Sequence, residues 1–341
     1  MMKIVGLDVG GAHLKVAVAE GGSVRDVRQI VCPLWQGLDK LEAALAEAAP
    51  LLPKSARHAI TMTGELSDLF TDRLAGASQL VHLLAARLGP DVRFWLGARG
   101  FGSAGDALAH PADVGSTNFL ATATLIGRNH RDCVLIDFGS TTADIIPIRD
   151  GTPCPLGLTD GVRQVSGELV YTGFTRTAVM GVTKAAPFRG QIVTLAREYL
   201  ATMADVRRIL GFDLTAVDLH ATADGKGKSI AESTARFARM FGRDAAEGTR
   251  SDWQAAAAFV REAQLRSIHD GVLQVLSRVT LPHDAPVIAA GIGAHDALEI
   301  ARRLDRPCQI FGDMIDAAGD TAFWATACAP AVAVALLAAS I

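Results

Sequence analysis

The sequence has few cysteines, no dense run of basic residues and little net charge. Its five cysteines are far apart and form no CxxC pair: Cys32, Cys133, Cys154, Cys308 and Cys328. An odd number of scattered cysteines favours neither a disulfide framework nor a zinc site, and it is typical of a reducing compartment. The formal net charge is −3 and Lys and Arg are dispersed, which argues against a nucleic-acid partner.

The first residues also lack the pattern of a signal peptide. The strand-like run KIVGLDVG begins after two residues and contains Asp8, whereas a signal peptide has a basic start and an unbroken apolar stretch. The C-terminal run AFWATACAPAVAVALLAASI is about long enough to cross a bilayer. However, it contains Pro330, is rich in alanine and has no flanking Lys or Arg. We therefore expect a cytoplasmic protein with no membrane partner, and a C-terminal helix buried between a sheet and the rest of its lobe.

The composition indicates a folded protein with a large core. The chain has 341 residues, of which 50% are hydrophobic and 20% are charged. A chain of this length divides naturally into two lobes. With no sign of a nucleic-acid or membrane partner, a small molecule is the expected substrate.

Two stretches of the chain repeat one pattern. IVGLDVGGAHLKVAVAEGG aligns without a gap with VLIDFGSTTADIIPIRDG, which superposes Asp8 on Asp137 and Gly10 on Gly139. Each copy has an apolar run ending in Asp, a tight turn, and a returning run, LKVAVA or ADIIPI, that alternates well enough for a strand. The pattern predicts two β-hairpins, each with a carboxylate at its turn.

The elements that follow the first hairpin predict an α/β lobe. They are a strand in SVRDVRQIVC, a helix through LDKLEAALAEAA, a short strand in HAITMTG and a helical stretch beginning at Glu65. This order repeats from Cys133 onward, so we expect two related lobes, 1–130 and 131–341, facing each other across a cleft. The second lobe carries a polar, Gly-rich insertion at about 157–252, and insertions of this kind often carry specificity.

The two predicted turns have the composition of a phosphate clamp. Glycine permits backbone angles that aim successive N–H groups at one point, where phosphate oxygens are the natural guest. The charge of a diphosphate or triphosphate calls for a hard cation, and Mg²⁺ prefers one or two carboxylates with retained waters. Asp8 and Asp137 would supply those carboxylates from opposite lobes. The residues expected to bind phosphate are Gly10, Gly11, His13, Gly139, Ser140, Thr141 and Thr142.

Three further residues near the turns carry alternative interpretations. Lys15 could reach a terminal phosphate as a point charge. His13 could donate a hydrogen bond or carry a proton beside the phosphates, or it could only pack within the turn. Asp144, on the returning strand, could be an outer metal ligand, a general base or a solvated strand residue.

A later stretch, APVIAAGIGAHDALEIARRL, predicts a buried strand, a turn with Gly291 and Gly293, and an amphipathic helix. The turn could cradle a third anion or the phosphates of a nucleotide. Equally, it could be a close strand-to-helix crossover that only glycine fits. The sequence leaves both interpretations open.

At these motifs the chain resembles the actin-like, sugar-kinase and heat-shock-chaperone superfamily. DVGGAHLK and DFGSTTAD match its two phosphate motifs, and AAGIGAH stands in the adenosine position. The closer resemblance is to the hydantoinase/oxoprolinase-like branch of one-carbon transfer pathway proteins linked to tetrahydromethanopterin, which includes an enzyme of methanofuran biosynthesis. The stretches that carry this resemblance are VGGAHLK, CPLWQGLD, TMTGEL, LGARGF, IDFGSTTADIIP, GELVYTG, TMADV and TADGKGKS.

The resemblance implies a two-lobed actin-like/sugar-kinase fold, which is a duplicated ribonuclease H-like fold. It also implies a transferase of methanofuran or methylofuran biosynthesis with Mg²⁺ as cofactor. In that family a phenol oxygen attacks a furanylmethyl carbon and diphosphate leaves without consumption of ATP. The implied substrates are an aminomethylfuran diphosphate and a phenol such as tyramine, glutamyltyramine or tyrosine.

The insertion holds the candidates for binding the phenol. They are Glu168, also a candidate catalytic residue, Tyr171 and Arg176 in GELVYTGFTRT, with Lys226 and Lys228 in TADGKGKS. Each has a plainer interpretation, because Glu168 could cap a helix and the lysines could lie in a solvated loop.

Two other functions remain open at this stage. One is an ATP-dependent small-molecule kinase with its adenosine pocket at Gly291 and Gly293, and the other is an actin-like ATPase or sensor. AAGIGAH lacks the paired glycines usual in the kinases, which weakens the case for ATP. Ala178 stands where the synthase resemblance leads us to expect proline. The sequence gives no signal for an oligomeric state.

Overall fold

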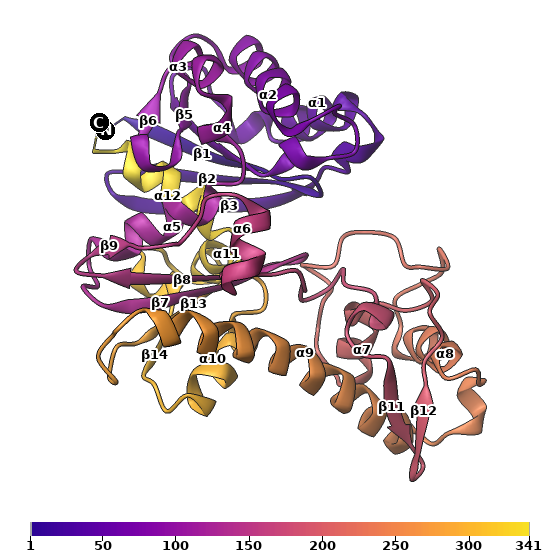
Figure 1. The fold of residues 1–341 in the computed structure, drawn as a ribbon. Coiled ribbons are helices and arrows are strands. Elements are labelled where there is room, and N and C mark those ends of the chain that lie inside the picture. The colour runs from indigo at the N-terminus through magenta and orange to yellow at the C-terminus, as the bar shows by residue number, and fades with distance from the viewer. Residues whose placement is uncertain (1, 341) are drawn as a thin grey trace.

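The computed structural model describes residues 2–340 as two sheet-containing lobes and a smaller helical lobe set to one side (Figure 1). The first sheet has the strand order β3-β2-β1-β4-β5-β6. The strand bounds are β1 Lys3–Val9, β2 His13–Glu20, β3 Ser23–Val31, β4 Arg57–Met62, β5 Arg93–Trp95 and β6 Phe101–Gly102. The order of strands and helices expected for the first lobe is therefore present.

Helices cover the outer face of this sheet. They are α1 Leu38–Glu47, α2 Arg73–Leu88, α3 Ala104–Ala109 and α4 Pro111–Val114. The helix that we expected from Glu65 begins instead at Arg73, because the Asp72 side chain accepts a hydrogen bond from Ala75 N at 2.9 Å and caps it. Glu65 itself lies in a 3₁₀ turn, Gly64–Leu66, and is buried.

The second sheet repeats the order of the first. Its strands run β10-β8-β7-β13-β14, with β9 paired to β8. The strand bounds are β7 Cys133–Phe138, β8 Ala143–Arg149, β9 Thr152–Pro153, β10 Leu169–Val170, β13 Val287–Ala290 and β14 Cys308–Ile310. The helices of this lobe are α6 Asp160–Ser166, α9 Arg250–Arg278 and α10 Ala294–Arg303. The hairpin β7–β8 occupies the place that β1–β2 occupies in the first sheet.

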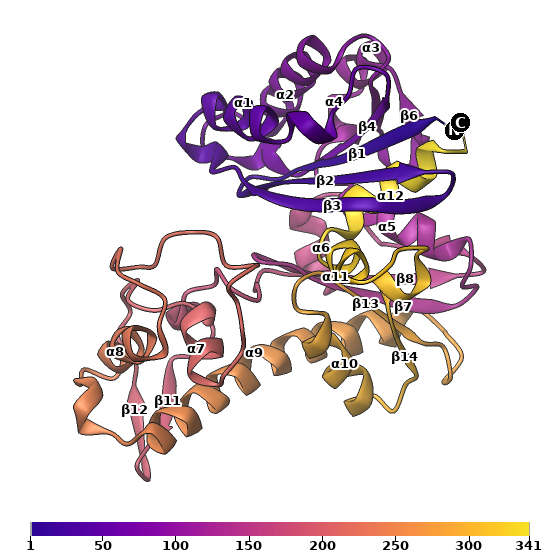
Figure 2. The same ribbon diagram turned by 180° about the vertical axis from the view of Figure 1, so that it is seen from behind.

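Two apolar helices lie between the sheets, as both views show (Figures 1 and 2). They are α5 Asn118–Gly127 and α12 Ala329–Ala338, and their side chains share one core cluster with both sheets. Helix α12 packs on β1 so closely that a Cβ at Gly6 would come within 2.0 Å of the carbonyl oxygen of Ala331. The C-terminal helix of the second half therefore covers the sheet of the first, and not the sheet of its own lobe.

The alanine-rich C-terminal run is two helices and not one. Helix α11 spans Asp320–Ala327, and α12 follows at an angle of 97°. Within residues 2–340 no single helix has the length and apolar character to cross a membrane. The bent pair of α11 and α12 together has enough length and apolar character, judged by length and composition only. Most residues of α12 are fully buried in the protein core.

The third lobe is built from the insertion and one end of α9. It contains the hairpin β11 Ala185–Phe188 and β12 Gln191–Thr194, with α7 Met203–Ile209 and α8 Ile230–Met240. Trp253 at the start of α9 packs in the core of this lobe, whereas Ile268 and Val272 further along pack in the second lobe. The segment that leaves the second sheet begins after β10 and not at Gly157, because α6 and β10 still belong to that lobe.

Candidate active site

Both hairpin turns open into one cavity of about 460 Å³. The first and second lobes line it together, and α12 contributes Pro330 at its start. The sequence-predicted residues that line it are Asp8, Gly10, Gly11, His13, Lys15, Asp137, Gly139, Ser140, Thr141, Thr142, Asp144, Tyr171 and Arg176. Residues more than 160 positions apart are thus gathered at one place.

The first hairpin places a carboxylate beside a cation. Asp8 and Lys15 are directly opposite each other in the antiparallel β1–β2 register, so their side chains share one face. Lys15 Nζ lies 3.1 Å from Asp8 Oδ2, and Asp8 is only 1% exposed. Burial alone would lower the pKa of Lys15, but the carboxylates of Asp8 and Asp137 outweigh it and the pKa is raised. Lys15 is therefore a fixed positive charge in the cavity.

The second hairpin places two carboxylates opposite each other. Asp137 and Asp144 are register partners in β7–β8. Burial raises the pKa of Asp137 to about 7, the nearby Lys15 lowers it, and Asp144 and Asp8 add to the rise. Asp144 has its own cation, because Arg163 Nη2 donates to it at 2.5 Å. The Arg163 guanidinium in turn lies 3.6 Å from the centre of the Phe119 ring.

The donors present fit a hard cation such as Mg²⁺. Asp8 Oδ1 is buried and has no hydrogen-bond partner. Among residues 2–340 no group of three or more His, Cys, Asp or Glu side chains could hold a metal. One or two carboxylates, completed by water and phosphate oxygens, is the set that Mg²⁺ uses in phosphate-binding sites. Asp8 and Asp137 are the residues that would hold it.

The two turns close in the same way. Gly10 N donates to the carbonyl of His13 at 3.0 Å, and Gly139 N donates to the carbonyl of Thr142 at 2.9 Å. These two amides stabilise the turns and are not free to bind phosphate, which differs from the expectation for both glycines. The hydroxyls of Ser140 and Thr141 lie on the cavity wall and can donate to phosphate oxygens.

The segment after β10 is fastened to the second turn. Phe174 N donates to Gly139 O at 2.9 Å, and Arg176 N donates to Ser140 O at 3.0 Å. The Arg176 side chain donates to Thr141 Oγ1 at 3.2 Å. Its guanidinium lies 5.2 Å from the centre of the Trp35 ring, so it spans both lobes. Tyr171 stands at the mouth of the cavity and is 62% exposed.

Three of the candidates from the insertion lie outside the cavity. Glu168 is 0% exposed, pairs with Arg278 and accepts a hydrogen bond from Leu156 N at 2.7 Å. These contacts tie β10 to α9 and leave Glu168 no access to a substrate in this cavity. Lys226 lies in an exposed loop, and Lys228 Nζ donates to the carbonyl of Asp218 within the third lobe.

The turn at Gly291 and Gly293 is closed. Gly291 N donates to Thr326 O, and Gly293 N donates to Phe138 O, both at 2.8 Å. A Cβ at Gly291 would lie 2.4 Å from Phe138 O, and one at Gly293 would lie 2.4 Å from the Phe138 ring. Of the two interpretations, the geometry agrees with the close crossover that only glycine fits. The amides are not available for a nucleotide phosphate.

Several cavity residues were missed by sequence reasoning. Thr63 and Ser116 line the cavity where β4 ends, and Asn118 begins α5. Ser116 is a non-glycine residue at φ 54, a strained angle that is concentrated at functional sites. Asp160 comes from α6, and burial raises its pKa. Of these four residues, only Thr63 lay in a stretch, TMTGEL, that the resemblance had picked out.

His220 joins the third lobe to the first turn. His220 lies in the loop before α8, and its ring centre is 4.6 Å from that of His13 in an edge-to-face arrangement. The ring centre of Trp35 lies 5.8 Å from that of His220. Burial, followed by the charges of His220, Lys15 and Arg176, lowers the pKa of His13 to about 2. His13 is therefore neutral at physiological pH.

Two related lobes, each with a carboxylate hairpin facing one cavity, define a protein of the actin-like/sugar-kinase fold. A solved structure of nucleotide-free acetone carboxylase matches 97% of this chain and 70% of its own, with a TM-score of 0.57 and 11% identity. A glucokinase of the ROK family from Streptomyces griseus matches 99% of this chain and 100% of its own, with a TM-score of 0.45 and 15% identity. At 11% identity the likeness to acetone carboxylase concerns the fold alone.

The family follows from the sequence comparison. Residues 57–333 match the hydantoinase/oxoprolinase family, so the chain belongs to it. It is 32% identical over 243 residues to the (4-{4-[2-(gamma-L-glutamylamino)ethyl]phenoxymethyl}furan-2-yl)methanamine synthase of Methanocaldococcus jannaschii, covering 71% of this chain and 72% of that protein. The protein of the same name from Methanococcus vannielii is 34% identical over 124 residues, which are 36% of this chain and 55% of that protein.

Proposed function

We propose that the protein is a transferase of methanofuran biosynthesis that couples an aminomethylfuran methyl diphosphate to a phenol, which is tyramine, glutamyltyramine or tyrosine. The product is an aryl ether and diphosphate is released. The main observation behind the proposal is that Asp8 and Lys15 of the first lobe and Asp137 of the second line one cavity. It is supported by relatives whose name describes a phenoxymethylfuran product.

The residues of the two turns suit a diphosphate leaving group. In the reaction the carbon–oxygen bond to diphosphate breaks, so negative charge grows on the departing oxygens. Lys15 and the hydroxyls of Ser140 and Thr141 are placed to stabilise that charge before it develops. Mg²⁺ held by Asp8 and Asp137 would supply further neutralisation of the diphosphate.

The remaining steps take place at the methylene carbon. The electron-rich furan ring stabilises positive charge there, so the protein has mainly to hold the phenol close and exclude water. The phenol oxygen forms the new bond, and its proton passes to an oxygen of the departing diphosphate. Tyr171 stands at the mouth of the cavity, where the phenol would enter, and Arg176 lines the cavity between the second turn and Trp35.

The reaction can be tested directly. The protein is incubated with Mg²⁺, an aminomethylfuran diphosphate and one of the three phenols, without ATP, and products are measured by mass spectrometry. We expect an ether and an equal amount of diphosphate, both lost when EDTA is added. If the protein instead binds ATP at micromolar concentration and phosphorylates a small alcohol, the kinase interpretation replaces this one.

A further inference from the structure

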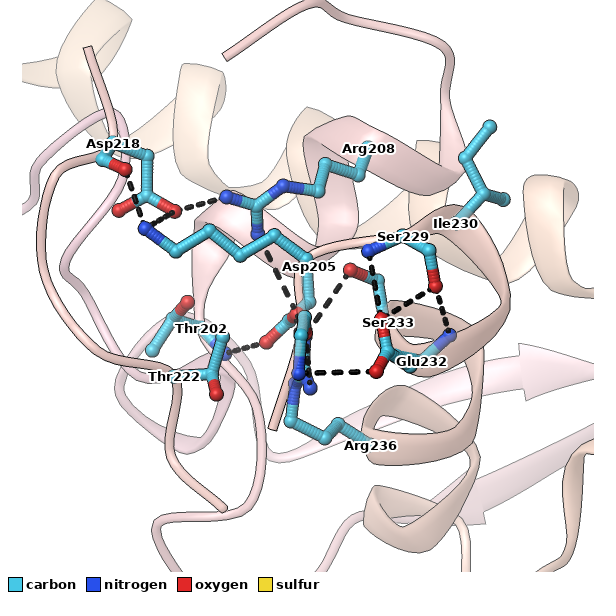
Figure 3. A network of polar contacts seen from close by, with 12 residues as sticks. Thr202, Asp205, Arg208, Asp218, Thr222, Ser229, Ile230, Glu232, Ser233 and Arg236 are labelled. Atoms are coloured by element: carbon cyan, nitrogen blue, oxygen red, sulfur yellow. Dashed lines mark hydrogen bonds and ion pairs between the residues drawn. The ribbon is translucent and has the colours of Figure 1, made fainter. Parts of the chain in front are cut away.

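Two family stretches that the site does not use, TMADV and TADGKGKS, meet in the third lobe (Figure 3). Asp205 from the first stretch lies at the start of α7. Its carboxylate accepts from Arg236 Nε at 3.0 Å and from Arg236 Nη2 at 2.7 Å. Arg236 Nη1 then donates to Asp224 Oδ1 and to the carbonyl of Gly227, each at 3.0 Å. Arg236 is fully buried on α8, so these bonds join the second stretch to both helices.

A second set of contacts holds the other end of the same loop. Arg208, on α7, pairs with Asp218, and Lys228 Nζ donates to the carbonyl of Asp218 at 2.5 Å. The loop between α7 and α8 is thus fixed on both sides of residue 220. Buried ion pairs contribute little net stability, because desolvation of the charges offsets their attraction. The main consequence of this network is therefore where it places the loop.

The loop carries His220 to the first hairpin turn. No other contact between aromatic rings in residues 2–340 joins the third lobe to the turn of β1–β2. His13 is 4% exposed and lines the cavity, and the Nε2 atoms of both histidines are buried without a hydrogen-bond partner. A buried donor or acceptor without a partner destabilises the fold, so the pair is unfavourable as a purely structural contact.

The charges around the pair favour an anionic ligand. Lys15 and Arg176 both lie close enough to lower the pKa of His13, and Arg176 also lowers that of His220. Asp218 acts on His220 in the opposite direction but is paired with Arg208. Uncharged imidazole can still donate one N–H to a phosphate oxygen.

We propose that His220 is a positioning residue, which the network of TMADV and TADGKGKS holds against His13 so that the His13 ring can donate a hydrogen bond to the substrate diphosphate. The inference rests on the proposed function, because it takes the ligand at this end of the cavity to be a diphosphate. It gives the third lobe a part in binding the leaving group as well as the phenol.

Calorimetric titration with inorganic diphosphate and Mg²⁺ tests the inference without requiring turnover. His220→Ala should weaken diphosphate binding about tenfold, the typical effect of losing one hydrogen bond to a charged group. His220→Phe, which keeps the ring contact, should retain most of the affinity. Because His220 acts through His13, His220→Ala should cause no further loss in a His13→Asn background.

Kinetics and controls separate positioning from general damage. His220→Ala should raise the KM for the furan diphosphate and leave the KM for the phenol unchanged. His82→Ala, an exposed histidine on α2, should match the wild type in every assay. Asp205→Asn, which weakens the network, should act in the same direction as His220→Ala, with folding checked by the thermal midpoint.

The possible results keep the two proposals apart. If wild-type protein binds diphosphate and His220→Ala binds it equally well, or loses the same affinity in both backgrounds, the positioning role is wrong and the proposed reaction stands. If the variants behave as expected but no ether forms, the proposed reaction is wrong and the positioning role stands. If wild-type protein does not bind Mg²⁺ and diphosphate at all, both are overturned.

Discussion

The two hairpins have the same strand pairing and turn closure but differ in local charge. In β1–β2 the residue opposite Asp8 is Lys15, whereas in β7–β8 the residue opposite Asp137 is Asp144. Both turns close with the same hydrogen bond between a glycine amide and the carbonyl three residues later. One facing residue on the returning strand thus distinguishes the electrostatics of the two copies.

This difference gives the two hairpins different roles in binding a phosphate chain and its cation. Asp8 is already paired with Lys15, whereas no ion pair involves Asp137 in the part of the chain that the structure describes. Arg163 neutralises Asp144, so Asp137 remains a buried carboxyl with a pKa raised by burial to about 7. A cation brought in with a diphosphate would relieve that unfavourable burial. The first hairpin supplies a fixed positive charge, and the second supplies a place for a mobile one.

The largest expected effect comes from removing either turn carboxylate. Asp8→Asn and Asp137→Asn should each lower turnover at least about a thousandfold, because both carboxylates would hold the cation that the leaving group needs. Circular dichroism should show an unchanged fold. Asp91→Asn, at an exposed position after α2, serves as the control. Near-normal turnover in either turn variant would show that the two hairpins are not a joint clamp.

The next effect concerns the strand that pairs with the returning strand of each hairpin, which is β3 in the first sheet and β10 in the second. β3 is nine residues long, whereas β10 is two residues long and is held by the Glu168–Arg278 pair. Glu168→Ala should lower the free energy of unfolding by about 3 kcal/mol, since it leaves Arg278 without its buried partner. Denaturant unfolding measures this, and kcat of the folded fraction should stay near normal. A variant that is as stable as the wild type but inactive would show that Glu168 has a catalytic role.

A smaller effect should separate the second turn from the segment attached to it. Tyr171→Ala and Arg176→Ala should raise the KM for the phenol roughly tenfold to a hundredfold, whereas Ser140→Ala and Thr141→Ala should raise the KM for the diphosphate substrate instead. Steady-state kinetics with each substrate varied in turn gives the four values. Wild-type kinetics in the Tyr171 and Arg176 variants would show that this segment has no part in selecting the phenol.

The smallest effect is a pH dependence of stability without metal. Because the folded pKa of Asp137, about 7, lies above its ordinary value, its contribution to stability is full at low pH and is lost as pH rises through 7. In EDTA, Asp137→Asn should therefore be more stable than the wild type at pH 8, by roughly 1–2 kcal/mol, and the advantage should shrink at pH 5. Thermal unfolding across this range measures it. An advantage that does not change with pH would contradict the raised pKa.

The sequence predicted the parts of the site whose signal is local. Each turn carboxylate stands at the end of an apolar run, so the hairpins and the facing of Asp8 and Asp137 could be inferred from the repeat. His220 and Asp160 could not, because His220 lies in a loop and Asp160 at the start of α6, and only tertiary packing brings them to the turns. The start of the insertion was missed because β10 is too short to show alternation. Gly291 and Gly293 fit both a cradle and a crossover until their amide partners were known.

Calorimetric titration of diphosphate with and without Mg²⁺ tests the central claim most directly. The wild-type protein should bind diphosphate when Mg²⁺ is present and lose at least about a hundredfold in affinity in EDTA, because two carboxylates facing an anion need a cation between them. The double variant Asp8→Asn, Asp137→Asn should show no effect of Mg²⁺. If the double variant keeps undiminished, Mg²⁺-dependent affinity for diphosphate, the two hairpins do not form the clamp.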